Sequence, residues 1–442
     1  MHWLLRLPYA ALGATAEMAA VLTPDSHGKL ARTLRARRGI AARFRAFTAQ
    51  RDPSRPLVWF HAPSVGESLQ ALPVLERVRA SAASPQAAVT WFSPSAEAFA
   101  RRFDAEFRDY LPFDTVRGAR AALDALRPTA LVFSKLDIWP VLTREAAGRG
   151  VRLGLISGTV RAGSGRLSPL ARAILRDAYA RLDLVGAIGD TDAERLQSLG
   201  VPARAIRVTG DTRYDQAWER AQRLDRSRPV FDGLASTRPT LVAGSTWSSD
   251  EAVLTTAWDE VRAAVPGARL VIAPHESTAA HLEPLRAWAA QRGLRSAALG
   301  GASVSDADVI LVETVGVLGD LYAFGDVAFV GGGFHAPGLH SVLEPAAHGR
   351  PVLYGPGGAA NPDARRLEAA QGAGLVRDAE SLSSLLRRWL GNARECRAAA
   401  DAAAGVVRSG VGAADRAAAL VGELLAGRGW PPESGAPSAG AN

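Results

Sequence analysis

Short apolar runs alternate with amphipathic helical patterns along most of the chain. In the first half, the apolar runs lie at residues 57–60, 88–92, 130–133, 152–157, 184–188 and 206–209. Helical patterns lie between them, at residues 66–79, 95–107, 117–126, 169–181 and 192–199. Strands that alternate with helices form parallel sheets. The pattern therefore predicts one α/β domain over residues 51–215.

A second alternating series follows a polar stretch that reads as an interdomain linker, residues 216–238. Its apolar runs lie at residues 240–243, 269–273, 309–312, 327–330 and 351–354, and its helical patterns at 251–264, 279–292, 315–322, 341–348 and 363–370. This predicts a second α/β domain over residues 239–426, and two such domains would enclose a cleft. Residues 427–442 are rich in Pro, Gly, Ser and Ala, which predicts a disordered tail.

The N-terminal segment, residues 1–50, combines an apolar stretch with a basic one. Residues 3–22 are apolar but contain Arg6, Pro8 and Glu17, which neither a signal peptide nor a secure membrane span would carry. The basic residues behind it are Lys29, Arg32, Arg35, Arg37, Arg38, Arg43, Arg45 and Arg51. An apolar helix backed by basic residues can lie on an anionic membrane surface. We expect such a membrane-associating helix; the alternative is a helix packed on the protein's own surface.

Composition narrows the functional classes. The chain has 442 residues, a net charge of +8 and one cysteine, so it has no internal disulfide framework and fits a reducing compartment. No Cys/His group has the spacing of a zinc site, and we expect no metal or cofactor. The basic run has few interleaved aromatic residues, which disfavours nucleic acid as a partner. Fifty of the fifty-two basic residues are arginine, so Lys135 is conspicuous.

Three common nucleotide and hydrolase motifs are missing. The loop after the first apolar run offers only Gly66, where a nicotinamide-binding domain needs Gly-x-Gly-x-x-Gly. Gly28-Lys29 continues into Leu30, without the hydroxyl residue of a phosphate-binding P-loop. No Gly-x-Ser-x-Gly frames a serine nucleophile between a strand and a helix. A dehydrogenase, a P-loop NTPase and an α/β-hydrolase are therefore disfavoured.

Glu67 is the most informative single residue of the first domain. The run Leu57–Glu67 leaves a predicted strand through a Pro/Ser/Gly loop and places Glu67 in the first turn of a helix. Ligands bind at this edge of open α/β sheets. A carboxylate there either complements the helix dipole or acts as a general base that faces a cleft. Lys135 and Asp137 in Ser134–Pro140 follow another strand, and Arg213 in Gly210–Asp215 could neutralise a leaving phosphate.

The second domain carries several polar motifs at predicted strand ends. Gly331-Gly332-Gly333 could let backbone N–H groups approach a phosphate, or could form a tight turn. Ser341 and Glu344 fit a helix capping box, although Glu344 could also accept the hydroxyls of a ribose. Gly244–Trp247 and Ala273–Glu276 lie after two further strands.

Taken in order, these segments resemble the Kdo transferases of lipopolysaccharide synthesis, a two-domain GT-B glycosyltransferase family. The resemblance rests on residues 61–67 (His-Ala-x-Ser-Val-Gly-Glu), 210–215, 244–246, 273–276, 313–318 and 326–356, and the last begins Asp-Val-Ala-Phe-Val-Gly-Gly-Gly. It implies an inverting enzyme that moves Kdo from CMP-Kdo to a lipid A precursor. The resemblance also implies that this enzyme works at the cell inner membrane, on its cytoplasmic face. Two GT-B domains of the Rossmann-like type would bind the acceptor and the CMP-sugar.

The resemblance also implies roles for individual residues. Glu67 takes the position of the catalytic base, Arg213 that of a basic residue that stabilises the transition state, and Lys135 and Asp137 lie where the family usually has two glutamates. The segments that match the CMP-binding ones contribute Ser245, Thr246, Pro274, His275, Val315, Gly316, Val317, Gly332, Gly333, Ser341, Val342, Leu343 and Glu344.

Some motifs depart from the family pattern and resemble a divergent branch. Ala-Pro-His-Glu at residues 273–276 replaces Ala-Pro-Arg-His, Ser-Thr-Trp at 245–247 replaces Ser-Thr-His, and Ile156-Ser157-Gly158 replaces a segment with Asn. Because an arginine is missing, we expect Arg213, His275 and the backbone of residues 331–333 to hold the donor phosphate. Two alternatives stay open: another GT-B transferase that uses a UDP-sugar, and a non-catalytic membrane-binding protein.

Overall fold

The computed structural model describes residues 3–24, 28–336 and 338–427, which form two compact units. One unit contains the chain up to Gln216 together with the segment that begins at Gly412, and the other contains Ala217–Val411. Each unit is built on one seven-stranded sheet, in which all neighbouring strands are parallel. The prediction of two parallel α/β domains is confirmed.

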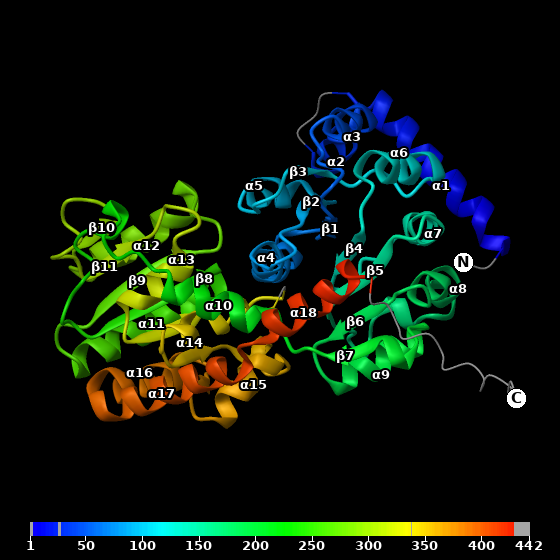
Figure 1. Ribbon diagram of the computed structural model, residues 1–442. Helices are drawn as coiled ribbons and strands as arrows, with labels where there is room; N and C mark the ends of the chain where they lie inside the picture. The colour runs from blue at the N-terminus through cyan, green and yellow to red at the C-terminus, as the bar shows by residue number, and fades with distance from the viewer. Residues whose placement is uncertain (1–2, 25–27, 337, 428–442) are drawn as a thin grey trace, which may run out of the picture. The chain divides into compact units, whose positions relative to one another are not determined.

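The first sheet has the strand order β3-β2-β1-β4-β5-β6-β7 (Figure 1). Its strands are β1 (Leu57–His61), β2 (Gln86–Trp91), β3 (Phe107–Tyr110), β4 (Ala130–Ser134), β5 (Arg152–Gly158), β6 (Leu184–Ala187) and β7 (Ile206–Val208). All five residues of β1 are buried, as expected for a central strand that is covered on both faces. The strand order reverses between β1 and β4, where ligands collect in such sheets.

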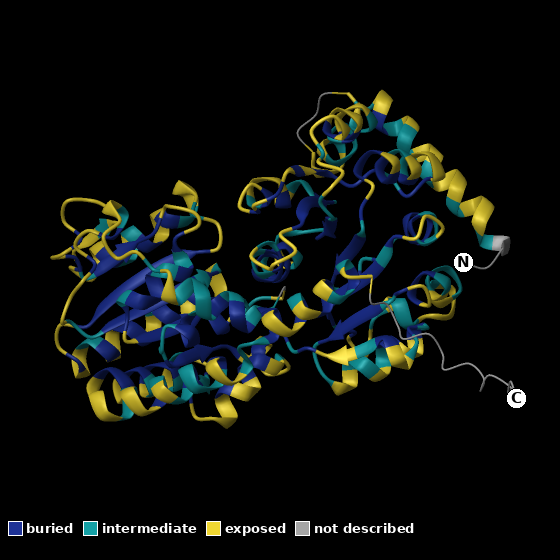
Figure 2. Cartoon of the chain, viewed as in Figure 1, coloured by how far each residue is buried: buried dark blue, intermediate teal, exposed yellow. Residues whose placement is uncertain are grey.

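Helices cover both faces of this sheet. They are α3 (Ile40–Thr48), α4 (Val65–Arg79), α5 (Glu97–Ala100), α6 (Val116–Leu126), α7 (Pro140–Ala147), α8 (Pro169–Tyr179), α9 (Asp190–Leu199) and α18 (Ala413–Leu425). One buried cluster joins the sheet to α3, α6, α7 and α8, and a second joins it to α4 and α18. The buried sheets lie between the more exposed helices in both units (Figure 2). The helix predicted at 95–107 is wrong over most of its length, because β3 begins at Phe107 and α5 has only one turn.

The second sheet has the order β10-β11-β9-β8-β12-β13-β14. Its strands are β8 (Thr240–Thr246), β9 (Arg269–Pro274), β10 (Ser296–Ala298), β11 (Val309–Leu311), β12 (Val327–Val330), β13 (Val352–Tyr354) and β14 (Ala373–Leu375). Its helices are α11 (Ser248–Ala264), α12 (Ala279–Gln291), α13 (Leu318–Leu321), α14 (Leu343–Ala347), α15 (Pro362–Ala369), α16 (Ala379–Gly391) and α17 (Ala393–Gly410). Here the order reverses between β8 and β12. Helix α10 (Thr212–Gln222) begins in the first unit and ends in the second.

The division between the units differs from the predicted one at two places. The predicted linker 216–238 is not a loose connection, since its first residues continue α10 and Pro229–Phe231 form a 3-10 turn with Phe231 buried. The predicted second domain ended at residue 426, but α18 packs on the first sheet, and a Cβ on Gly154 would lie 2.5 Å from Leu424 Cδ1. The tail predicted to be disordered falls, after Gly427, outside the described residues.

The N-terminal segment forms α1 (Trp3–Leu22) and α2 (Lys29–Arg35), and α1 packs on its own unit. The Tyr9 hydroxyl donates to Asp114 Oδ2 at 2.8 Å, and the Thr115 hydroxyl donates to Glu17. The outer side of α1 exposes Leu7, Leu12, Met18, Val21 and Leu22. In the part of the chain that the structure describes, no helix is both long and apolar enough to cross a membrane. The alternative of a helix packed on the protein's own surface therefore holds for one side of α1.

Candidate active site

The end of β1 and the end of β4 bring Glu67 and Lys135 together at the point where the first sheet reverses its order. Helix α4 begins at Val65, so Glu67 lies in its first turn as predicted. Lys135 follows β4 directly and has a φ of +69°. A non-glycine residue with left-handed backbone is strained, and such residues cluster at functional sites. The turn at Lys135 directs its side chain toward the first turn of α4.

The Glu67 carboxylate has two hydrogen-bond donors. Ser64 Oγ donates to Oε2, and Lys135 Nζ lies 3.3 Å from Oε1. The Glu67 side chain is 16% exposed, and this burial pushes its pKa upward, but the Ser64 hydroxyl and the Lys135 ammonium more than offset it. The pKa of Glu67 therefore lies below its ordinary value, and the carboxylate is ionised at neutral pH. An ionised carboxylate that can still reach solvent is able to accept a proton.

Asp137 lies beside this pair within a network of aromatic and histidine side chains. Its Oδ1 accepts from Arg166 at 3.4 Å, and its Oδ2 lies 3.7 Å from Nε2 of the buried His61. Trp139 Nε1 donates to the same His61 nitrogen at 3.2 Å, which leaves that nitrogen unprotonated. His61 Nδ1 can then donate to the Thr90 hydroxyl at 3.1 Å. The charge partner of Asp137 is thus Arg166 rather than His61.

One cavity of about 750 Å³ within the first unit contains these groups. Glu67, Lys135 and Asp137 all line it, as the sequence predicted for a shared site. Two arginines that the sequence did not single out also line it, Arg161 and Arg166, both on the loop after β5. A Ser/Gly-rich loop directly after a strand was the available signal for them. The cavity therefore combines two carboxylates with three cationic side chains, a composition suited to an anionic ligand that is deprotonated there.

Arg213 does not line this cavity. It lies at the start of α10, where its guanidinium donates to Asp211 Oδ2 at 2.8 Å and 2.5 Å. Asp215, in the same motif, is fully buried and accepts from the backbone N–H groups of Gly412 and Ala414 at 2.8 Å and 3.1 Å. Part of the motif therefore holds the start of α18 on the first unit. A role for Arg213 in the transition state stays a prediction.

The end of β8 and the glycine run after β12 meet where the second sheet reverses its order. Asp250, fully buried in the first turn of α11, accepts from the backbone N–H groups of Gly332 at 2.8 Å and Phe334 at 3.0 Å. Gly331 N–H donates to the carbonyl oxygen of Gly244. The N–H groups of Gly331 and Gly332 therefore already have partners within the protein, and a phosphate contact of the backbone at residues 331–333 stays a prediction.

The glycines of this run are explained by close backbone packing. Gly332 has a φ of +86°, and a Cβ there would lie 2.2 Å from the Gly338 carbonyl oxygen. A Cβ on Gly333 would lie 2.4 Å from Gly355 N. Only glycine fits at such distances. Of the two readings of this run, the tight turn describes the geometry, and a direct ligand contact of Gly332 or Gly333 stays a prediction.

The remaining predicted donor residues gather at the same sheet edge. Ser245 has a left-handed φ of +54°, and the Thr246 hydroxyl donates to Glu251 at 2.7 Å. His275 follows Pro274 at the end of β9 and is exposed. The predicted donor residues 315–317 lie on the loop before α13. The Val315 side chain is 88% exposed and that of Val317 is buried, and Gly316 between them has a left-handed φ of +87°.

Of the two alternatives for Ser341 and Glu344, the capping box does not form. Helix α14 begins at Leu343, its N-cap residue is Val342, and no side chain caps it. Glu344 instead lies 3.4 Å from Arg220, which also pairs with Asp320 at 3.1 Å. Burial raises the pKa of Glu344, although Arg220 counteracts it. Glu344 is therefore available for a role other than a cap, and Ser341 is exposed.

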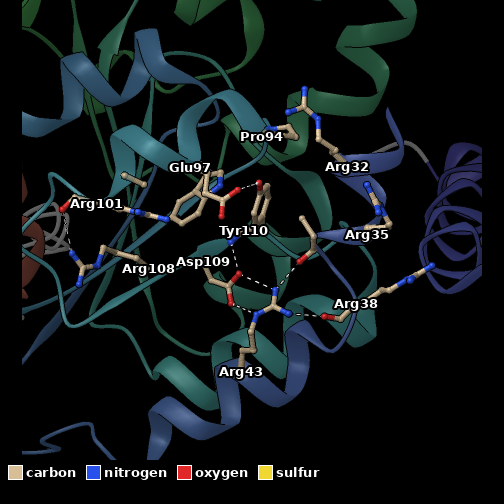
Figure 3. Close-up of a pocket in the computed structure, with 13 residues that line it drawn as sticks. Arg32, Arg35, Arg38, Arg43, Pro94, Glu97, Arg101, Arg108, Asp109 and Tyr110 are labelled. Atoms are coloured by element: carbon tan, nitrogen blue, oxygen red, sulfur yellow. Dashed lines mark hydrogen bonds and ion pairs between the residues drawn. The ribbon is translucent and has the colours of Figure 1, made fainter. Parts of the chain in front are cut away.

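A second cavity of the first unit, of about 1040 Å³, is rich in arginine (Figure 3). Arg43 pairs with Asp109 at 2.6 Å at its base, and the Glu97 carboxylate accepts from the Tyr110 hydroxyl. The arginines that line it are Arg32, Arg35, Arg38, Arg43, Arg101 and Arg108. Arg37 from the same basic segment has another role: it is buried over the Phe92 ring, and burial lowers its pKa to about 10.

The sequence of this chain matches one family of enzymes. Residues 33–216 match the family model described as 3-deoxy-D-manno-octulosonic-acid transferase. A 3-deoxy-D-manno-octulosonic acid transferase from Bordetella pertussis is 32% identical over 349 residues, which are 76% of this chain and 79% of the relative. The transferase of the same name from Haemophilus influenzae is 24% identical over 73% of this chain and 75% of its own length.

Solved structures confirm the fold alone. A UDP-GlcNAc 2-epimerase from Neisseria meningitidis, bound to UDP-GlcNAc, has a TM-score of 0.60 with 15% sequence identity. The match covers 84% of this chain and the whole of that chain. The architecture of two parallel α/β domains is thus of the GT-B type.

Proposed function

Because the chain belongs to the family of 3-deoxy-D-manno-octulosonic acid (Kdo) transferases, we propose that it uses Glu67 to transfer Kdo from CMP-Kdo to a lipid A precursor. As a member of this family it is a glycosyltransferase that acts in lipopolysaccharide synthesis. The donor, the acceptor and the roles of the residues are the proposed parts.

The observation that carries this proposal is the state and position of Glu67. Its carboxylate is ionised, lies in a cavity and has its pKa set by Ser64 and Lys135. Glu67 would accept the proton of an acceptor hydroxyl while that oxygen attacks the anomeric carbon of Kdo. The bond from this carbon to the phosphate oxygen would break, and CMP would leave with the electron pair. Attack opposite to the leaving group inverts the configuration at the anomeric carbon.

The cationic side chains of the same cavity suit an anionic sugar. Kdo carries a carboxylate, and Lys135, Arg161 and Arg166 can donate to it or to a phosphate of the acceptor. Lys135 would have a second role, because its ammonium keeps Glu67 ionised until Glu67 takes up the proton of the acceptor. The second unit would hold the CMP part of the donor at the strand ends of β8, β9 and β12.

We also infer that the protein works on the cytoplasmic face of the inner membrane. Leu7, Met18, Val21 and Leu22 lie on one side of α1 by helical spacing, and all are more than 60% exposed. The arginines of the second cavity would attract anionic headgroups. Both features belong to the first unit, the one that contains Glu67.

The test is product analysis by mass spectrometry after incubation with CMP-Kdo and a lipid A precursor. We expect Kdo-extended product from the wild type. Glu67→Gln removes the base but keeps the shape, so we expect turnover to fall by about 10²- to 10⁴-fold with folding preserved. Parallel incubations with UDP-sugars distinguish the other GT-B possibility, since turnover only with those donors would overturn the proposal.

A further inference from the structure

Four aromatic side chains form a continuous stack in the second unit. The ring of Trp247 lies 4.2 Å from that of His335 on one side and 4.5 Å from that of His275 on the other, measured between centroids. The ring of His340 continues the stack, 4.7 Å from His275. The planes of each pair are inclined by less than 30°. We call these four residues the imidazole stack.

The imidazole stack lies at the edge of the sheet where three adjacent strands end. His275 follows β9, Trp247 follows β8, and His335 and His340 are on the loop after β12. In the sheet these strands are neighbours in the order β9-β8-β12. This is the edge, and the point of reversed strand order, at which open α/β sheets bind their ligands.

The polar atoms of the imidazole stack are available to a ligand. Among the residues that the structure describes, the side-chain nitrogens of His275, His335 and His340 have no hydrogen-bond partner. The indole nitrogen of Trp247 is buried and likewise has no partner. His275 is exposed, and the other two imidazoles are half-buried. The three imidazoles are therefore open to a ligand that approaches this sheet edge from solvent.

The surroundings of His340 hold its pKa below the ordinary value of a histidine. Burial lowers the pKa of His340, and the nearby His275 and His335 lower it further, since like charges in contact repel. Asp250 has the opposite effect, but its carboxylate accepts from three backbone N–H groups, those of Trp247, Gly332 and Phe334. Glu276, next to His275, is exposed to solvent. An anion placed against the imidazoles would remove the repulsion.

We propose that His275, His335 and His340 bind the phosphate of the donor nucleotide and take up a proton from solvent as it binds. This inference rests on the proposed function, which places a CMP-sugar at this sheet edge. The N–H groups of Gly331 and Gly332 already have partners within the protein, and a backbone amide carries no net charge, so the imidazoles supply the positive charge. Binding and protonation are then coupled, and the phosphate and the proton each raise the affinity for the other.

The coupling has a measurable consequence for affinity. An imidazole that is neutral in the free protein and charged in the complex makes binding weaken as pH rises through neutrality. The expected slope is about tenfold in the dissociation constant per pH unit for each proton taken up. Fixed cations such as arginine would give no slope in this range, because their charge does not change below pH 9.

The probe is the methyl ester of CMP, since its phosphodiester keeps one negative charge at every pH used. Isothermal titration calorimetry from pH 6 to 9, in buffers of different ionisation enthalpy, measures affinity and proton uptake together. We expect uptake of about one proton per ligand near neutrality and a loss of affinity of about tenfold per unit above it. Cytidine, which lacks the phosphate, should bind more weakly and without proton uptake.

Two substitutions separate charge from shape. His340→Gln should reduce proton uptake and weaken binding of the methyl ester at pH 6, with little change for cytidine. His275→Arg should keep the affinity high at pH 9 and flatten the pH dependence, because its charge is permanent. The matched control is His348→Gln in the same unit: burial lowers the pKa of His348 to about 4, so this histidine stays neutral and its loss should change neither quantity.

The outcomes are distinct. Binding of the methyl ester with no proton uptake and a flat pH profile would overturn the imidazole site while leaving the transferase proposal intact. Equal loss of cytidine and methyl ester affinity in His340→Gln, with an unchanged melting temperature, would also overturn it. If neither CMP nor its ester binds at any pH, the proposed donor falls, and this inference falls with it.

Discussion

The ammonium nitrogen of Lys135 lies 3.3 Å from Oε1 of Glu67. Lys135 directly follows β4, and Glu67 lies in the first turn of the helix after β1, the strand that pairs with β4. The lysine is one of two in the chain. It occupies a left-handed backbone position that favours glycine. A strained turn that presents a rare lysine to the first turn of a helix indicates that the pair is selected for chemistry rather than for stability.

Removal of Lys135 should move the acid limb of the pH profile. A base must be ionised, so kcat/KM falls as pH drops through the pKa of Glu67, which Ser64 and Lys135 hold below its ordinary value. Lys135→Met removes the ammonium, and burial then raises the pKa, so we expect the acid limb to shift toward neutral pH. Lys135→Arg, which keeps the charge, should shift it less. An identical acid limb in Lys135→Met would show that the pair does not set the ionisation of Glu67.

The central strands were predictable because they are buried on both faces. A run such as Leu57–His61 is apolar throughout, and continuous apolar runs bounded by loops identify strands of parallel sheets. Of the four edge strands, β7 was predicted from the apolar run 206–209, but β3, β10 and β14 lacked this signal. The strand Phe107–Tyr110 has Arg and Asp in its middle, and Ser296–Ala298 has only small side chains. An edge strand has a neighbouring strand on one side only and is less buried, so fewer of its side chains must be apolar.

The site was predictable as far as it depends on local order along the chain. Glu67 follows a strand by a short loop, and parallel strands end at one edge, which brings Lys135 and Asp137 to it. The imidazole stack could not be predicted, because it depends on which strands are neighbours. His275 and His340 are separated by 65 positions in sequence and meet only through the order β9-β8-β12. The packing of α18 on the first sheet could not be predicted for the same reason, because it joins segments that lie far apart in the sequence.

The exposed side of α1 should determine membrane binding. Replacement of Leu7, Met18, Val21 and Leu22 by serine removes apolar side chains that are each worth about 1.5–3 kcal/mol when fully buried. We expect partition onto anionic phospholipid vesicles to fall by more than roughly tenfold in a flotation assay. The matched control is Leu170→Ser with Val208→Ser, two exposed apolar residues elsewhere in the same unit. Equal partition of both variants would argue against α1 as the membrane contact.

Turnover should not depend on a divalent metal. The reaction needs positive charge near the Kdo carboxylate, for which the cavity around Glu67 offers Lys135, Arg161 and Arg166. It also needs positive charge near the leaving phosphate, which we propose the imidazole stack supplies. We therefore expect activity to persist in excess EDTA, measured as product formed per minute at saturating donor. A complete loss that magnesium restores would contradict this expectation and would require a metal-assisted departure of CMP.

Asp250 should determine whether the donor edge of the second sheet is formed at all. Its buried carboxylate accepts from the N–H groups of Trp247 at 2.9 Å, Gly332 at 2.8 Å and Phe334 at 3.0 Å. In Asp250→Asn one oxygen becomes an NH₂ group, which would face an amide donor and leave it unpaired. We expect a loss of about 1–3 kcal/mol in the free energy of unfolding, measured by urea denaturation.

The same substitution should weaken nucleotide binding, since Trp247 lies in the middle of the imidazole stack and the loop of Gly332 and Phe334 leads into His335. Asp259→Asn on the same helix is the matched control: Asp259 is exposed and pairs with Arg292 on the surface, so its loss should cost well under 1 kcal/mol. If Asp250→Asn bound CMP as the wild type does, the loop would hold the imidazole stack in place without the Asp250 carboxylate. The geometry of this sheet edge would then depend on the packing of the glycines alone.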